Sequence, residues 1–127
     1  MKEKSKLVLI INTTKREEIM IGLYDDQIKK EVYKTDRQSE DILILLDKFI
    51  KKAGRTLNDL TAILVNIDQG SYTGVRIGVT IANTLAWSLD IPVFGYQEKD
   101  FELVLKKAQN ASDKFSKIAL PIYADSI

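Results

Sequence analysis

The chain has 127 residues, a formal net charge of +1, and neither cysteine nor histidine. A chain of this length is expected to form one domain and to bury roughly two thirds of its unfolded surface without a disulfide or a structural metal. The missing residue types exclude thiolate and imidazole metal sites, cysteine nucleophiles and every serine–histidine arrangement. The near-neutral charge argues against strong general binding of nucleic acid.

Apolar runs and their periods predict three strands, a helix, a strand, a helix, a strand, a helix and one more short strand. The predicted strands cover residues 7–11, 18–24, 27–34, 60–67, 92–95 and 117–123. The predicted helices cover residues 39–53, 73–89 and 97–110, the first two with N-caps at Ser39 and Thr73. An antiparallel opening followed by parallel strands with right-handed crossovers predicts an α/β fold, a mixed five-stranded sheet of order 3-2-1-4-5 with flanking helices.

Three glycines, Gly70, Gly74 and Gly78, recur at every fourth position where a strand passes into a helix. Each costs about 1 kcal/mol relative to alanine in a helix interior, so another part of the protein must approach this backbone closely. Such a turn can also cradle a phosphate, but the Walker lysine is missing and Asp68 would repel an anion. Close packing is therefore favoured. The residues assigned to this signature loop and its packing are Gly70, Ser71, Thr73, Gly74 and Gly78.

Residues 70–78, which read GSYTGVRIG, closely resemble the signature of the TsaB (YeaZ) family, together with Leu85-Ala86-Trp87 and Ile91-Pro92-Val93. This family is the accessory subunit of the bacterial tRNA threonylcarbamoyladenosine machinery. The resemblance covers roughly residues 7–124 and implies a ribonuclease H-like half of the actin, Hsp70 and sugar-kinase superfamily.

Members of this family usually continue into a second, similar domain. We expect residues 1–116 to form the ribonuclease H-like domain, and residues 117–127 to resemble the first strand of the missing one. The second half is then naturally absent, removed, or supplied by another polypeptide. Every property that the family assigns to the second domain stays open.

Asn12 and Asp68 should lie at the carboxyl ends of neighbouring strands, where open α/β sheets bind ligands. The family commonly has aspartate at the first position and a glycine and proline before the signature, so both residues depart from its pattern. A neutral asparagine cannot hold a divalent cation as a carboxylate would. A two-metal nuclease needs several clustered carboxylates, and only Asp68 is well placed, with Glu40 and Asp41 as supplements. We therefore expect no catalytic residue, metal or cofactor.

The helix predicted at 73–89 has an expected core face and an expected outer face. The apolar stripe assigned to the core comprises Gly74, Ile77, Gly78, Ile81, Leu85 and Leu89. A rotation of roughly 100° per residue places Arg76, Thr80, Asn83 and Trp87 opposite this stripe. On the first helix, Ile44 falls among charged residues, where an ordinary exposed side chain is an equally good explanation. The predicted partner-binding residues are Ile44, Arg76, Asn83 and Trp87.

By resemblance, the chain is a noncatalytic subunit that pairs with the catalytic subunit TsaD through the helices at 39–53 and 73–89. It would act with the ATPase TsaE and meet tRNA only through the complex. Two alternatives remain: a small ribonuclease H-like metal-dependent hydrolase that uses Asp68, and a stand-alone homodimeric scaffold. The sequence shows no leader peptide or long apolar span, so we expect a cytoplasmic protein without a membrane partner.

Overall fold

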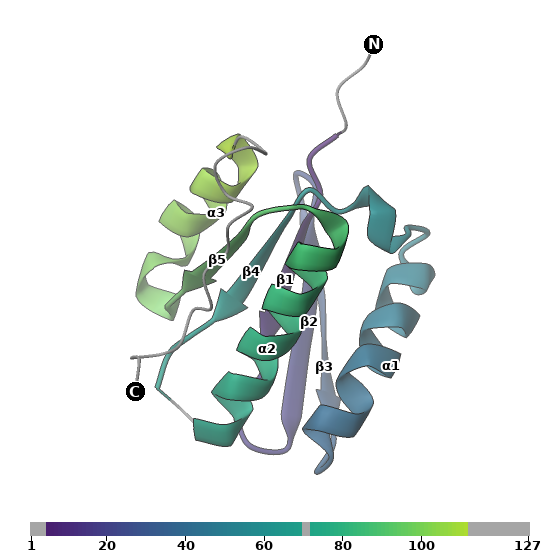
Figure 1. Ribbon diagram of the computed structural model, residues 1–127, viewed down its shortest axis with the longest axis vertical. Coiled ribbons are helices and arrows are strands. Elements are labelled where there is room, and N and C mark those ends of the chain that lie inside the picture. Colours follow the sequence, from purple (N-terminus) through teal and green to yellow (C-terminus); the bar gives the residue numbers. More distant parts are fainter. Residues whose placement is uncertain (1–4, 70–71, 112–127) are drawn as a thin grey trace.

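Five strands form one mixed sheet of order β3-β2-β1-β4-β5 in the computed structural model, which describes residues 5–69 and 72–111 (Figure 1). The strands are β1 (Val8–Asn12), β2 (Glu18–Tyr24), β3 (Ile28–Lys34), β4 (Ala62–Asn66) and β5 (Val93–Tyr96). The β1–β2 and β2–β3 pairs are antiparallel, whereas β4 runs parallel to β1 and to β5. The predicted sheet order is confirmed. The strand predicted at 117–123 lies outside the described residues.

Helices cover both faces of the sheet. Helices α1 (Gln38–Lys52) and α2 (Tyr72–Leu89) share one face, and α3 (Phe101–Asn110) packs against β4 and β5 on the other. Two short 3-10 turns, η1 (Leu57–Asp59) and η2 (Glu98–Asp100), precede β4 and α3. None of the described helices combines the length and apolarity needed to cross a bilayer.

Three predicted helix boundaries are wrong by a few residues. The N-cap position of α1 is Arg37, so Ser39 lies inside the helix. Thr73 likewise lies in the first turn of α2, which begins at Tyr72. The predicted helix 97–110 is interrupted, because η2 precedes α3. At the other end of α1, Gly54 has a φ of 76°, the left-handed conformation that commonly ends a helix.

The central strand β1 is buried on both faces. Leu9 and Ile11 belong to the core beneath α1 and α2, whereas Val8 and Ile10 belong to the core beneath α3. All four side chains are at most 2% exposed. This explains the continuous apolar run at residues 7–11, which is typical of a strand covered by helices on both sides.

The core face of α2 differs from the predicted stripe. The fully buried side chains are those of Val75, Val79, Ala82 and Ala86. The larger side chains assigned to the core are only partly buried: Ile77, Ile81, Leu85 and Leu89. Small residues face the sheet because α2 lies very close to it. A Cβ atom added to Gly78 would collide with Oγ1 of Thr13 and would contact Val65 of β4.

Replacing Gly78 with leucine should lower the free energy of unfolding by about 1 to 3 kcal/mol through overpacking. Gly78→Ala is a sharper variant, because the same change at an open helix position raises stability by about 1 kcal/mol. Here the collision with Thr13 should make it destabilising. Chemical denaturation of both variants tests this expectation. Thr80→Leu, at an exposed position of α2, is the matched control and should stay within about 0.5 kcal/mol of the wild type. A Gly78→Ala protein that is more stable than the wild type would contradict the close contact.

Candidate partner-binding surface

The segment after β1 positions the first turns of both α1 and α2. Thr13 is fully buried, and its hydroxyl donates a hydrogen bond of 2.5 Å to the carbonyl oxygen of Gly74 in α2. The side-chain amide of Gln38, the first residue of α1, donates to the carbonyl oxygens of Thr13, Lys15 and Glu18 at 3.4, 3.0 and 2.7 Å. The first turns of both helices are therefore tied to the same loop, and the helices run side by side (Figure 1).

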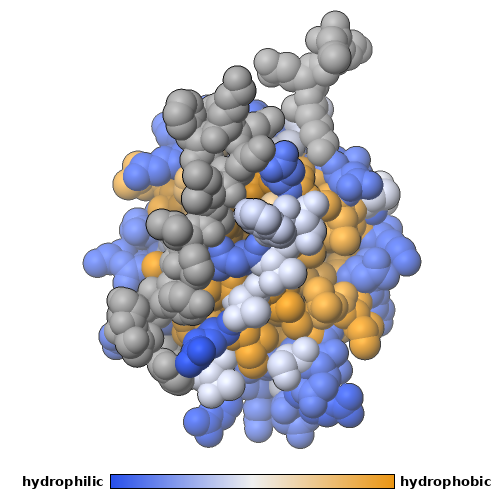
Figure 2. All heavy atoms as spheres, viewed as in Figure 1, coloured by the Kyte–Doolittle hydropathy of each residue, from blue (hydrophilic) through white to orange (hydrophobic). Residues whose placement is uncertain are grey.

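A hollow of about 380 Å³ lies between these two helices near their N-terminal ends. Its lining residues are Ser39, Thr73, Arg76, Ile77, Thr80 and Ile81. Figure 2 shows apolar side chains gathered beside α2, on the side toward α1. The partly buried isoleucines that sequence periodicity assigned to the core contribute the apolar part of this wall. The surface thus combines hydroxyl groups and a cation with an apolar floor.

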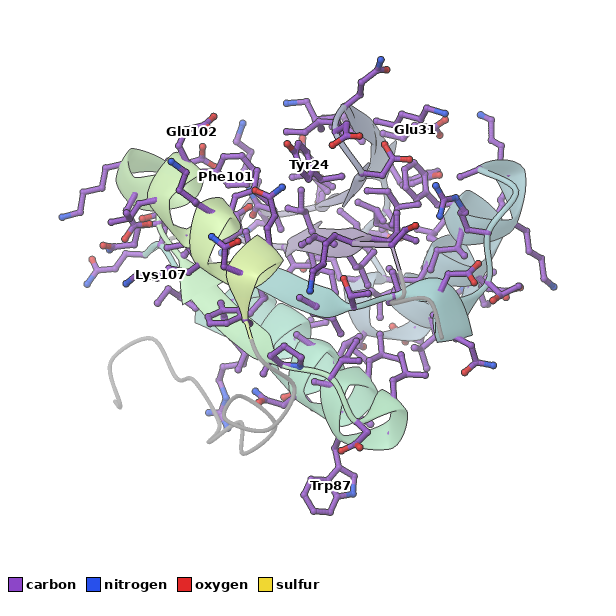
Figure 3. All side chains as sticks on the ribbon, turned by 90° about the horizontal axis from the view of Figure 1, so that it is seen from above. Tyr24, Glu31, Trp87, Phe101, Glu102 and Lys107 are labelled. Carbon is purple, nitrogen blue, oxygen red and sulfur yellow. The ribbon has the colours of Figure 1, made fainter. Side chains whose placement is uncertain are left out.

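The structure places the four predicted partner-binding residues in different surroundings. Trp87 is 82% exposed and projects away from the fold (Figure 3), and Ile44 is 67% exposed. Arg76 is exposed and lines the hollow. Asn83 is half-buried, and its side-chain nitrogen donates to the carbonyl oxygen of Val79 at 2.9 Å. The predicted exposure of Trp87 and Ile44 is therefore confirmed, whereas Asn83 is not a fully exposed residue.

Asn83 and Ile44 lie apart from the hollow. Asn83 lies on the same side of α2 as Arg76, within about 20° around the helix, but two turns further along, and it does not line the hollow. Ile44 follows Leu43, which sequence reasoning missed. Leu43 is 54% exposed and lies one helical turn beyond Ser39, on the side of α1 that lines the hollow. Its spacing from Ser39 is the signal that could have identified it.

The two described glycines of the signature loop make close contacts with other parts of the fold. Gly74 provides the carbonyl oxygen that accepts the Thr13 hydrogen bond, and Gly78 allows the close approach of Thr13, which follows β1, and of Val65 in β4. Thr73 contributes to the wall of the hollow. Gly70 and Ser71 lie outside the described residues.

Polar residues at the carboxyl ends of β4 and β5 are bonded to one another. The side-chain oxygen of Asn66 accepts a hydrogen bond from the Asp68 amide at 2.7 Å, and its nitrogen donates to Glu98 at 3.1 Å. Asp68 in turn accepts a bond from the Glu98 amide at 2.9 Å. At the end of β1, the side chain of Asn12 accepts bonds from the amide and the hydroxyl of Thr14. Asn12 and Asp68 thus each make local hydrogen bonds.

Beside this network, Tyr96 of β5 is 1% exposed and stacks edge-on against Phe101, with ring centroids 5.2 Å apart. Burial, reinforced by the nearby Glu98 carboxylate, raises the pKa of the Tyr96 hydroxyl far above its ordinary value. The phenol therefore stays protonated, and the Tyr96 side chain is part of the core beneath α3. Within residues 5–69 and 72–111, no three carboxylates lie close enough together to hold a metal ion.

Comparisons with known proteins agree with this fold. The family model for TsaD, tRNA N6-adenosine threonylcarbamoyltransferase, matches residues 33–119, which is more than half of the chain. The chain is 41% identical over 78 residues to the tRNA threonylcarbamoyladenosine biosynthesis protein TsaB of Bacillus subtilis. It is 30% identical over 93 residues to TsaB of Buchnera aphidicola. A solved YeaZ structure from Pseudomonas aeruginosa superimposes with a TM-score of 0.67 at 22% identity, over 72% of this chain.

The matches extend over only part of the relatives. They cover 61% and 72% of this chain but 31% and 44% of the two TsaB proteins, and 45% of the YeaZ chain. The chain therefore spans less than half the length of each of these three proteins. Taken together, the family model and the curated relatives show that the chain belongs to the tRNA N6-adenosine threonylcarbamoyltransferase family, and within it to the TsaB/YeaZ group.

Proposed function

We propose that this chain is a noncatalytic subunit that takes part in threonylcarbamoyladenosine modification of tRNA by binding a TsaD-like catalytic subunit. The observation that carries the proposal is the face of α1 and α2 that the described residues leave uncovered, with its hollow and the exposed Trp87. A TsaE-like ATPase would act on the same complex. Because the chain is almost neutral, tRNA would contact it only within the assembly. The protein would work in the cytoplasm.

The chemistry of the proposed surface suits a protein partner. Tryptophan and arginine are enriched among residues that dominate binding energy, and both occur on α2 here. Trp87, Ile44 and Leu43 leave large apolar side chains in water, at a cost that a partner would remove. The hollow would receive a side chain of the partner between Thr73 and Ile81. A second copy of the chain is the alternative occupant of this face.

Trp87→Ala should leave the melting temperature unchanged and weaken binding to the TsaD of the same organism by about 2 kcal/mol or more. Titration calorimetry measures the affinity. Since Trp87 is the only tryptophan, incorporating 5-fluorotryptophan gives one ¹⁹F resonance that should shift when unlabelled TsaD is added. Leu103→Ala is the matched control, because Leu103 is a large exposed apolar residue on α3. Equal losses of affinity in the two variants, or an unfolded Trp87→Ala protein, would refute the assignment.

A ribonuclease H-like hydrolase is the competing function. The catalytic role would fall on Asp68, whose carboxylate accepts a hydrogen bond from the backbone of Glu98. We predict that the purified chain cleaves neither DNA nor RNA in magnesium, because a two-metal mechanism requires clustered carboxylates. Fluorescent hairpin and duplex substrates test this prediction. Magnesium-dependent cleavage that disappears in Asp68→Asn would establish the hydrolase instead.

A further inference from the structure

The outer edge of β3 is an unusually regular sheet edge. Within the described part of the chain, β3 pairs with β2 alone. Its seven residues keep one uninterrupted register, from Glu18 opposite Lys34 to Tyr24 opposite Ile28, without a proline or a bulge. Edges in globular proteins are usually shortened, bulged, covered or lined with charged side chains, above all lysine, because unpaired backbone groups invite another strand. Of these features β3 has the charged side chains, in Lys29, Lys30 and Lys34. The backbone of β3 is therefore regular enough to accept a complete additional strand, provided that the added strand offsets these lysine charges.

Two exposed apolar side chains lie on this strand. Ile28 is 42% exposed and Val32 is 51% exposed. Both lie on the face that α3 covers elsewhere, since they pair with Tyr24 and Met20, which pack against the core beneath α3. Helix α3 packs over β4 and β5, far from this end of the sheet. A strand added at the edge would contact both side chains.

We propose that this edge binds the β3 strand of a second copy, so that two antiparallel strands join the sheets across a two-fold axis at Lys30. In this register Ile28 of one copy lies opposite Val32 of the second copy, and Lys29 lies opposite Glu31. Each of these favourable pairs occurs twice by symmetry. Shifting the axis to Lys29 or Glu31 would still leave one like-charge pair at the axis, would lose both pairs of Lys29 with Glu31, and would place apolar residues opposite lysines. The sequence of β3 therefore favours one register over its neighbours.

The charges on β3 are compatible with this pairing. Hydrogen bonds from Lys52, at 2.7 Å, and from Tyr33 lower the pKa of Glu31, so its carboxylate is ionised at neutral pH. One Glu31 carboxylate can accept bonds from Lys52 and from Lys29 of the second copy, since it has two oxygens. At the axis, Lys30 lies opposite Lys30 of the second copy, and the long aliphatic part of each side chain lets the ammonium group turn into water. This single repulsion makes the association reversible.

Nothing in the described fold blocks the pairing sterically. Helix α1 packs over β2, so the α1 helices of two copies would lie about three strand spacings apart, roughly 14 Å. Packed helices need only about 8 to 10 Å. Figure 3 shows Glu31 and Trp87 on opposite sides of the molecule. Pairing through β3 would therefore leave the face of α1 and α2 free for another partner.

Disulfide trapping tests the register directly, because the natural chain contains no cysteine. Lys30→Cys should form a covalent dimer on oxidation, since directly opposed residues have Cα atoms about 5 Å apart. Val32→Cys alone should not, because two copies of residue 32 would be offset by four residues, roughly 13 Å. A mixture of Ile28→Cys and Val32→Cys should form the crossed dimer. Efficient self-linking of Val32→Cys, or no dimer from Lys30→Cys, would overturn the proposal.

A charge exchange tests the same register without a covalent bond. By sedimentation equilibrium, Lys29→Glu and Glu31→Lys should each raise the dissociation constant roughly tenfold, because two attractive pairs become repulsive. Combining Lys29→Glu and Glu31→Lys restores both pairs, and adding Lys52→Glu keeps an opposite charge beside residue 31, so this combined variant should recover dimerisation. Trp87→Ala should dimerise like the wild type. A combined variant as weak as the single ones, or a dimer that is lost in Trp87→Ala, would show that copies associate elsewhere.

Discussion

The buried hydroxyl of Thr13 is the contact on which the arrangement of the helices depends. It donates to the backbone of Gly74 at the start of α2 and occupies the space beside Gly78. A helix that begins this close to the sheet can present only small side chains to it, and for that reason Val75, Val79, Ala82 and Ala86 form its core face. The larger apolar residues are displaced to the flank toward α1. The surface proposed for partner binding is thus a consequence of close packing on the opposite side of the same helix.

Much of the fold could be predicted from sequence because the periodic signals were strong. Alternation in β2 and β3, continuous apolar runs in β1 and β4, and the right-handed crossover rule together fix the sheet order. The rotation of α2 could not be predicted in the same way. Periodicity favours the face with the most apolar surface, which contains Ile77, Ile81 and Leu85. In the structure, the face of α2 with the smallest side chains packs against the sheet, and only the contact between Thr13 and Gly78 reveals why.

The partner surface was predictable in part for a related reason. Trp87 and Ile44 are so far from either candidate core face that a change in helix rotation leaves them in water. Asn83 lies near the boundary between core and surface, so the same change leaves it half-buried. The polar residues at the strand ends were correctly placed by topology, since Asn12 ends β1 and Asp68 follows β4. Their hydrogen bonds to Thr14 and Asn66 could not be predicted from the sequence, because such contacts depend on loop geometry.

The contacts of Gln38 also constrain how this protein can diverge. Its amide recognises only main-chain oxygens, those of Thr13, Lys15 and Glu18. A contact of this kind depends on the path of the loop backbone and not on the identity of the loop side chains. Exchanges at Lys15 and Arg16, both exposed, can therefore accumulate while α1 and α2 keep their spacing. The charge at this end of the molecule can therefore change during evolution without altering the geometry of the face formed by α1 and α2.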